Sequence, residues 1–65
     1  MLFVVKKAYP TDPEKDWEKH FDNFSLADDE YVAQAKGHEG GEATLTIAIR
    51  VSDGHDELVE ERRLS

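Results

Sequence analysis

The sequence predicts a small α+β fold, and three observations lead to this prediction. Thr44–Val51 alternates polar and apolar residues, a period of two that is typical of a strand with one buried face. Trp17, Phe21 and Phe24 are spaced to form one stripe along a helix. Two glycines at 40–41 precede the alternating run and fit a hairpin turn. We therefore expect a β-α-β-β domain: a strand, a helix packed on the sheet, an antiparallel hairpin, and a short C-terminal helix or edge strand.

The chain is short enough to form one small acidic domain over residues 1–65. A domain of this size buries only about 60% of the surface that its unfolded chain exposes, so its core is thin. The sequence has no cysteine, which excludes disulfides and thiolate metal sites as stabilisers. We therefore expect self-association, as a homodimer or a higher oligomer.

The composition also indicates the cellular compartment of the protein. Absence of cysteine fits a reducing compartment. No apolar run approaches the roughly 20 residues that are needed to span a bilayer. We therefore expect a cytoplasmic protein.

Leu2–Tyr9 is predicted to be the first strand. Both of its faces begin with apolar residues, a pattern that indicates a central strand or a contact between subunits. Pro10 is expected to end the strand, because proline has no N–H to donate to a sheet.

The next segment is predicted to be the helix, with two alternatives for its start. Thr11 can act as the N-cap, with Glu14 completing a capping box. Alternatively Asp12 is the N-cap and Pro13 occupies the first helical position. In either case the aromatic stripe is expected to pack on the aliphatic face of Thr44–Val51.

Tyr31–His38 fits either a helix or a strand. A helix is indicated by a weak capping box from Ser25 to Asp28, followed by apolar residues at helical spacing. A strand is indicated because a three-residue loop, Glu39-Gly40-Gly41, would give a favourable hairpin register. That register pairs Ala35 with Leu45, Ala33 with Ile47, Tyr31 with Ile49 and Glu30 with Arg50. Because the hydrophobic pattern sets register, we predict the strand.

The last segment follows a turn at Asp53-Gly54, a strong two-residue hairpin signal. Its residues have the propensity of a short, partly exposed helix, which we favour. The alternative is an edge strand protected by charge. In that alternative Glu60 and Arg62 would lie on the apolar face of the sheet.

The net charge of −7 guides the functional hypothesis. It disfavours direct binding to nucleic acid or to an anionic membrane, and it favours a partner protein with a basic surface. We predict a non-enzymatic protein-binding module, in its specific form an inhibitor that occupies a nucleic-acid-binding site on its partner. Small acidic phage and plasmid proteins that block host machinery share this size and charge, an analogy that rests on no motif. The alternatives are an obligate homo-oligomer with an assembly role and, less favoured, a regulator that binds a metal or small molecule.

No residues stand out as catalytic. The carboxylates fall on predicted turns and an exposed helix face, and the serines have no histidine and acid arranged to activate them. His20, His38 and His55 lack metal-ligand spacing, so we expect neither a metal nor another cofactor. The candidate partner-binding residues are acidic: Asp28, Asp29, Glu30, Glu39, Glu42, Asp56 and Glu57.

Overall fold

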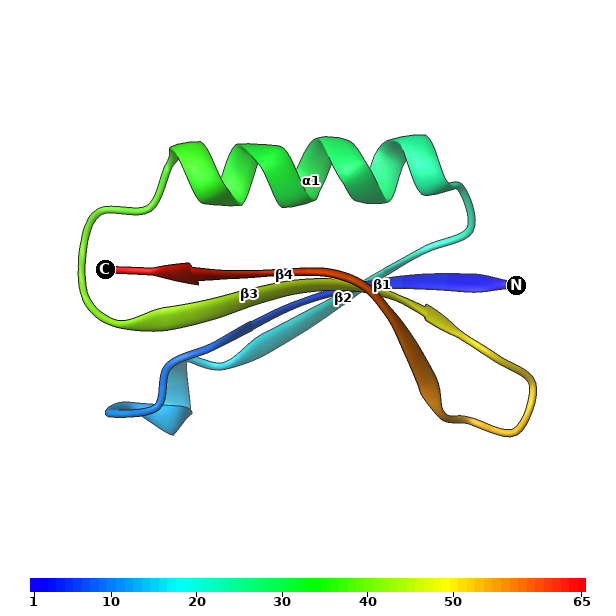
Figure 1. The fold of residues 1–65 in the computed structure, drawn as a ribbon, viewed down its shortest axis with the longest axis horizontal. Helices are drawn as coiled ribbons and strands as arrows, with labels where there is room; N and C mark the ends of the chain where they lie inside the picture. Colours follow the sequence, from blue (N-terminus) through cyan, green and yellow to red (C-terminus); the bar gives the residue numbers. More distant parts are fainter.

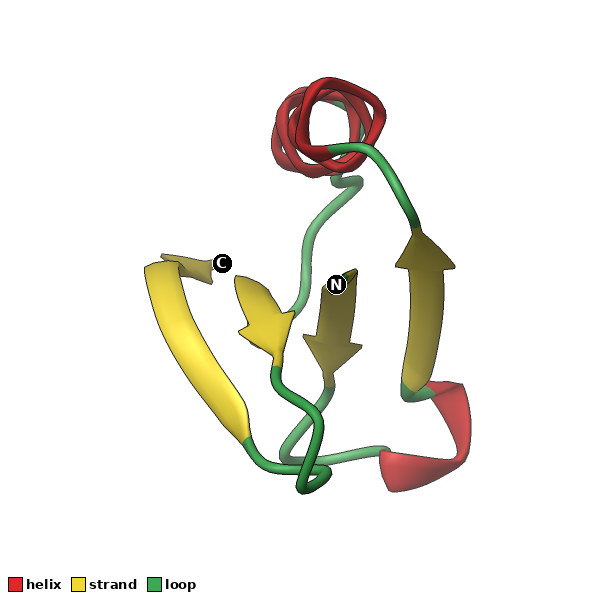
Figure 2. Ribbon diagram, turned by 90° about the vertical axis from the view of Figure 1, so that its right-hand side faces the viewer, coloured by secondary structure: helices red, strands yellow, loops and turns green.

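A four-stranded antiparallel sheet carries one helix on one of its faces in the computed structural model, which describes residues 1–65 (Figures 1 and 2). The elements are β1 (Leu2–Ala8), a 3₁₀ turn (Pro13–Lys15), β2 (Trp17–Phe21), α1 (Phe24–Lys36), β3 (Ala43–Arg50) and β4 (Asp56–Leu64). The strands are ordered β2-β1-β3-β4 across the sheet. The predicted α+β class is confirmed, while several of its elements lie elsewhere in the chain.

The two strands with the clearest apolar patterns, β1 and β3, form the centre of the sheet. In β3, Leu45 and Ile47 point towards the helix and are buried. In β1, Val4 and Val5 point to opposite faces and both are fully buried. Prediction of a central strand at the N-terminus and of a strand at Thr44–Val51 is therefore confirmed, with ends shifted by one residue.

The helix predicted to begin at Thr11 or Asp12 is wrong. Only one 3₁₀ turn forms there, and the chain then becomes extended at Asp16 (φ −60°, ψ 142°). The Asp16 carboxylate accepts a hydrogen bond of 2.7 Å from the Tyr9 amide, which closes the connection between β1 and β2. Trp17 and Phe21 lie on one face of β2, because a spacing of four residues satisfies a strand as well as a helix.

The strand predicted at Tyr31–His38 is also wrong, because residues 31–36 belong to α1 and residues 37–38 follow its end. Asn23 caps the helix, accepting hydrogen bonds from the amides of Ser25 (2.8 Å) and Leu26 (3.3 Å). Ala27 and Tyr31 lie one helical turn apart and face the sheet, where both are buried. The helical alternative was therefore correct in type, although Asn23 rather than Ser25 is the cap.

Replacing the Asn23 cap tests this helix start. Asn23→Ala is expected to lower the free energy of unfolding by about 1 kcal/mol, because the first-turn amides lose their acceptor. Asn23→Asp keeps an acceptor and is expected to retain wild-type stability. Urea titrations followed by circular dichroism would measure both, and equal midpoints for wild type and Asn23→Ala would contradict the cap.

The glycines at 40–41 belong to the connection between α1 and β3. Gly40 and Gly41 both have positive φ, 115° and 91°, a conformation that other residues rarely adopt. The left-handed glycine expected at this point is present, but the predicted hairpin is wrong. β3 pairs with β1 and β4 instead, so that Arg50 lies opposite Asp56 and not opposite Glu30.

The C-terminal segment is the edge strand β4, so the favoured short helix is wrong. The turn at Asp53-Gly54 forms as predicted, with Gly54 at φ 89°. Glu60 and Arg62 lie opposite Ile47 and Leu45, on the helix-facing side of the sheet. A register shift next to Val59, which is left without a partner, marks a β-bulge.

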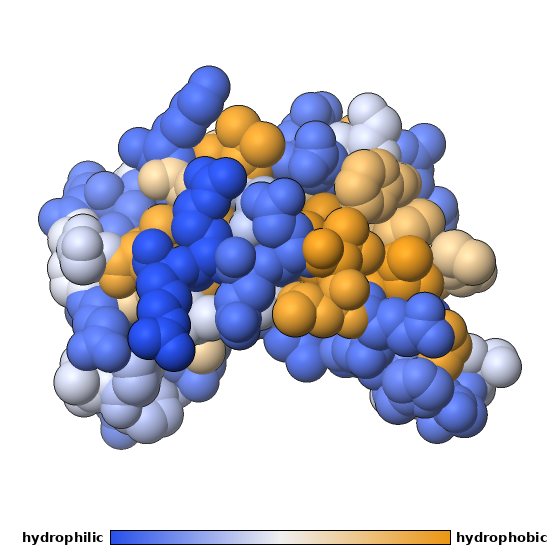
Figure 3. Space-filling view, in the orientation of Figure 1, coloured by the Kyte–Doolittle hydropathy of each residue, from blue (hydrophilic) through white to orange (hydrophobic).

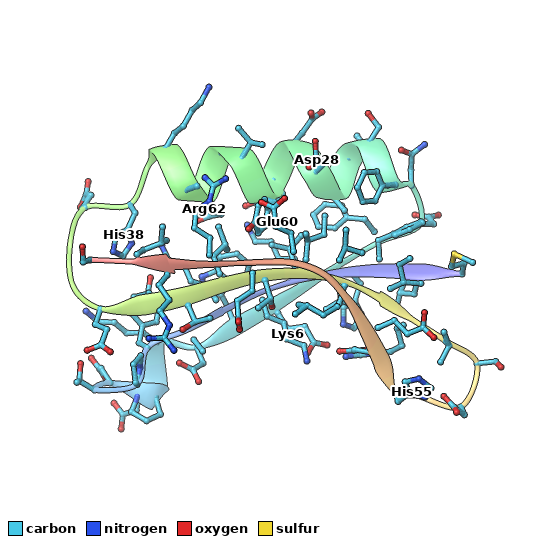
Figure 4. All side chains as sticks on the ribbon, in the orientation of Figure 1. Lys6, Asp28, His38, His55, Glu60 and Arg62 are labelled. Carbon is cyan, nitrogen blue, oxygen red and sulfur yellow. The ribbon has the colours of Figure 1, made fainter.

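The charged residues of β4 are tolerated because α1 packs mainly on β3, β1 and β2. Figure 2 shows α1 above the middle of the sheet, with β4 to one side. Glu60 and Arg62 point towards α1 from this uncovered strand and remain exposed to solvent (Figure 4). The face of the sheet opposite α1 has no covering layer.

Candidate partner-binding surface

The structure distributes the candidate acidic residues over three separate regions. Asp28 and Asp29 are exposed on the second turn of α1. Glu39 and Glu42 are exposed in the connection between α1 and β3. Asp56 and Glu57 are the first residues of β4, and this start of the strand lies at the opposite end of the molecule from that connection (Figure 1). The candidate residues therefore do not form one continuous site.

Glu30 differs from its two acidic neighbours because it is engaged within the chain. Its carboxylate accepts hydrogen bonds from Gln34 and, at 3.0 Å, from the Lys19 ammonium group of β2. These two bonds lower the pKa of Glu30 below its usual range. Glu30 therefore links α1 to β2 through an ion pair, and its carboxylate is less available to a partner than those of Asp28 and Asp29.

Asp56 is engaged still more fully, in a network on the uncovered face of the sheet. Arg50 of β3 binds its two carboxylate oxygens at 2.7 Å (Nε to Oδ1) and 3.1 Å (Nη2 to Oδ2). The Lys6 ammonium of β1 lies 2.9 Å from Oδ2. Arg50 Nη1 also binds Glu18 of β2 at 3.1 Å, and Glu18 contacts His20. We call these five residues the cross-sheet network, because they link all four strands.

Two pKa shifts follow from this arrangement. The hydrogen bonds from Arg50 and then from Lys6 hold the pKa of Asp56 well below its usual range. The contacts with His20 and Arg50 lower the pKa of Glu18. Both carboxylates are thus held in their charged form and are balanced by Lys6 and Arg50, which makes Asp56 a structural residue of the sheet.

Two hollows of the surface are lined by residues of the cross-sheet network. The largest, about 630 Å³, lies at the start of β1 and is lined by Met1, Leu2, Arg50, Val51 and Ser52. Its one charged side chain, Arg50, already binds Asp56 and Glu18. A second hollow of about 350 Å³ lies on the uncovered face, where the surface is visibly concave (Figure 3). Lys6 and Asp56, which line this second hollow, neutralise each other.

The histidines lie far apart. His38 is in the connection between α1 and β3, and His55 is in the β3–β4 turn, at opposite ends of the molecule (Figure 4). His20 lies on β2 beside Glu18. No group of three or more histidine, cysteine, aspartate or glutamate side chains is arranged to hold a metal ion. No helix of the structure is both long enough and apolar enough to cross a membrane.

Exposed apolar side chains concentrate on α1 and β4. Phe24, Leu26 and Val32 of α1 are 43%, 56% and 37% exposed, and Leu58 and Val59 of β4 are 60% and 46% exposed. Figure 3 shows apolar surface on the β4 side of the molecule, below the first half of α1. Exposed apolar groups bordered by charge are typical of protein contacts.

Sequence reasoning missed the cross-sheet network and the exposed side chains of α1. Both depend on the correct assignment of residues 17–36. In a strand, Glu18 and His20 are two residues apart and share a face, which would have indicated their contact. In a helix, Asp28 and Asp29 each lie one turn from an exposed apolar residue. No family model, curated protein or solved structure matches this chain, so the surface is interpreted from its own geometry.

Proposed function

We propose that this protein is a non-enzymatic, cytoplasmic binding module that docks on a basic surface of a partner protein through the outer face of α1. A specific form of this proposal is an inhibitor that occupies a site where the partner binds nucleic acid. The observation that supports it is the pair of exposed carboxylates, Asp28 and Asp29, which have no ion pair within the chain.

The surroundings of these two carboxylates support the choice of α1. Asp28 lies one turn from Phe24 and from Val32, and Asp29 lies one turn from Leu26. Charged groups steer a partner and set its orientation, while neighbouring apolar groups supply contact area. Lys36, at the far end, is the one basic residue of α1, so the outer face presents a single sign of charge to a partner.

Paired charge reversals test the proposal against a simple effect of net charge. Asp28→Lys with Asp29→Lys reverses the α1 carboxylates. Glu39→Lys with Glu42→Lys makes the same change in net charge at an exposed site at the other end of α1. Wild-type protein would first be used to capture partners from a lysate of the source cells. The affinity of each captured protein would then be measured by calorimetry.

The α1 double variant is expected to bind at least about tenfold more weakly, since charge reversal places like charges opposite each other at the interface, which costs several kcal/mol. The loop double variant is expected to stay within about threefold of wild type, because exposed charges outside an interface act only at long range. Equal losses in both variants would assign the effect to net charge alone. Wild-type affinity in the α1 variant would exclude this face.

A second candidate function is a homo-oligomer with a structural or assembly role. The observation that favours it is the length of β4, a nine-residue strand whose outer edge is unpaired. Such edges readily accept another strand. The choice between the two functions depends on what that edge binds.

A further inference from the structure

The outer edge of β4 has a feature that the proposed partner surface on α1 does not use. Its charged residues run Glu60, Glu61, Arg62, Arg63, and they alternate between the two faces of the sheet. Glu60 and Arg62 face the helix side, where they contact each other at 3.5 Å. Glu61 and Arg63 are on the uncovered side, lie opposite Thr46 and Thr44, and make no ion pair within the chain.

The geometry of strand pairing restricts what can bind this edge. If a second copy pairs antiparallel with β4, a two-fold axis runs perpendicular to the joined sheet, and both helices lie on the same side. Residues directly opposite each other in the two copies then point to the same face of the joined sheet. Because side chains alternate between faces along a strand, the two-fold axis must pass beside one residue, which lies opposite itself, and not between two residues. A register centred on Arg62 sets Glu61 opposite Arg63 of the second copy, and this pair occurs twice.

We propose that two copies of this chain pair through the β4 edge, over Glu60–Leu64, to form a dimer with one continuous eight-stranded sheet. The unpaired charges on the uncovered side then find opposite charges directly across the new strand pair, where such pairs stabilise a sheet. On the helix side, Glu60 lies opposite Leu64 of the second copy. The two Arg62 side chains lie opposite each other at the two-fold axis, and each keeps Glu60 of its own chain as a counter-charge at 3.5 Å. A partner with a uniformly basic edge would leave Arg63 unpaired, so this sequence fits a second copy better.

The bulge next to Val59 supports this length of contact. Bulges bend a strand and end regular pairing. Between Glu60 and Leu64 the pairing of β4 with β3 is regular, so its outer edge is straight enough to accept another strand. The proposed contact occupies this regular stretch and stops at the bulge.

The other edge of the sheet lacks this self-complementarity. β2 has five residues, and its charged groups are already engaged within the chain. Glu18 binds Arg50, and Lys19 binds Glu30. Pairing through β4 leaves β2 at both margins of the joined sheet, which closes the assembly at two copies.

Charge exchange between Glu61 and Arg63 tests the dimer. Glu61→Arg places two arginines opposite arginines across the interface, and Arg63→Glu places glutamates opposite glutamates. Each single variant is expected to dissociate at least about tenfold more readily than wild type, since like charges directly opposite destabilise a strand pair. The Glu61→Arg result is the more telling, because that change lowers the net negative charge and would favour association if net charge alone mattered.

Two further samples restore opposite charges at positions 61 and 63 across the interface. The double variant Glu61→Arg with Arg63→Glu restores opposite charges in a homodimer at the wild-type net charge. An equimolar mixture of the two single variants restores them in a heterodimer. Sedimentation equilibrium over a range up to about 0.5 mM would measure all five samples, since small interfaces of this kind often dissociate in the micromolar range. Circular dichroism would verify that each variant keeps its fold.

A monomeric wild-type protein over this range would overturn the proposal, and so would association of the single variants at wild-type strength. Failure of the mixture to associate, or assembly beyond a dimer, would overturn the register and its closure. Reversal of Asp28 and Asp29 is expected to leave the dimer unchanged. The dimer through β4 and the partner surface on α1 are therefore tested by different variants, and either one can be wrong without the other.

Discussion

Replacing Tyr31 with alanine is expected to unfold a large part of the protein at room temperature. Tyr31 is the largest fully buried side chain and connects α1 to Leu45 and Ile47 of β3. Truncating a buried aromatic residue to alanine costs roughly 3–5 kcal/mol. That loss is comparable with the whole stability expected of a chain this short, at about 0.05–0.15 kcal/mol per residue. Urea unfolding followed by circular dichroism would measure the loss.

Two control variants make this result specific. Phe24→Ala truncates an aromatic side chain of the same helix that is 43% exposed, so it is expected to cost far less. Tyr31→Phe removes only the hydroxyl group, which is buried without a hydrogen-bond partner, and is expected to be neutral or slightly stabilising. Wild-type stability in Tyr31→Ala would contradict the packing of α1 on the sheet through this residue.

The surroundings of Tyr31 also explain why its hydroxyl group loses its proton less readily than that of a free tyrosine. Burial, together with the neighbouring Glu60 carboxylate, raises the pKa of Tyr31. The Arg62 guanidinium carbon lies 5.5 Å from the centre of the ring, a position in which a cation is attracted to the aromatic face. Glu60 and Arg62 therefore cover the side of the core that α1 leaves open, although both are charged.

The middle of the chain shows why fold class could be predicted while the position of the helix could not. Trp17 and Phe21 are four residues apart, and this interval places two side chains on one face of either a strand or a helix. The hydrogen bond from the Tyr9 amide to Asp16 selects the extended form, and it depends on the folded path of the chain. Phe24, the third residue of the predicted stripe, is the first residue of α1.

The predicted hairpin failed for a related reason. A hairpin between Tyr31–His38 and β3 would match apolar with apolar residues, but in the structure β3 pairs with β1 on one side and with β4 on the other. Its pairing with β1 joins residues that are 36 to 48 positions apart in the chain, which local pattern reasoning does not compare. The alternating run Thr44–Val51, the first strand at Leu2–Tyr9 and the Asp53-Gly54 turn had signals strong enough to be assigned from neighbouring residues alone.

The candidate site could be predicted only in part, because composition reveals how many acids there are but not which are free. Asp28 and Asp56 were indistinguishable in the sequence. The fold leaves Asp28 exposed on α1, and it places Asp56 between Arg50 and Lys6, which come from two other strands. The partner of a charge is set by strand order, and strand order was not predicted.

The cross-sheet network leads to the second large effect, a loss of stability in acid that depends on Asp56. The pKa of this carboxylate is lower in the folded protein than in the unfolded chain. As the pH falls below about 5, the unfolded chain therefore takes up the proton first, and the stabilisation by Asp56 is lost progressively. Above the usual aspartate pKa the contribution is complete. Glu18, whose pKa is also lowered, acts in the same direction.

Asp56→Asn is expected to lower the melting temperature at pH 7 by roughly 5–10 °C, because it loses charge-assisted hydrogen bonds to Arg50 and Lys6. It is also expected to lose less stability than wild type between pH 7 and pH 3 (about the range in which aspartates gain protons). Asp29→Asn makes the same chemical change at an exposed residue without an ion pair and should follow the wild-type profile. Thermal melts across this pH range would show the difference. Parallel profiles for wild type and Asp56→Asn would mean that the ionised Asp56 carboxylate does not contribute to the stability of the sheet.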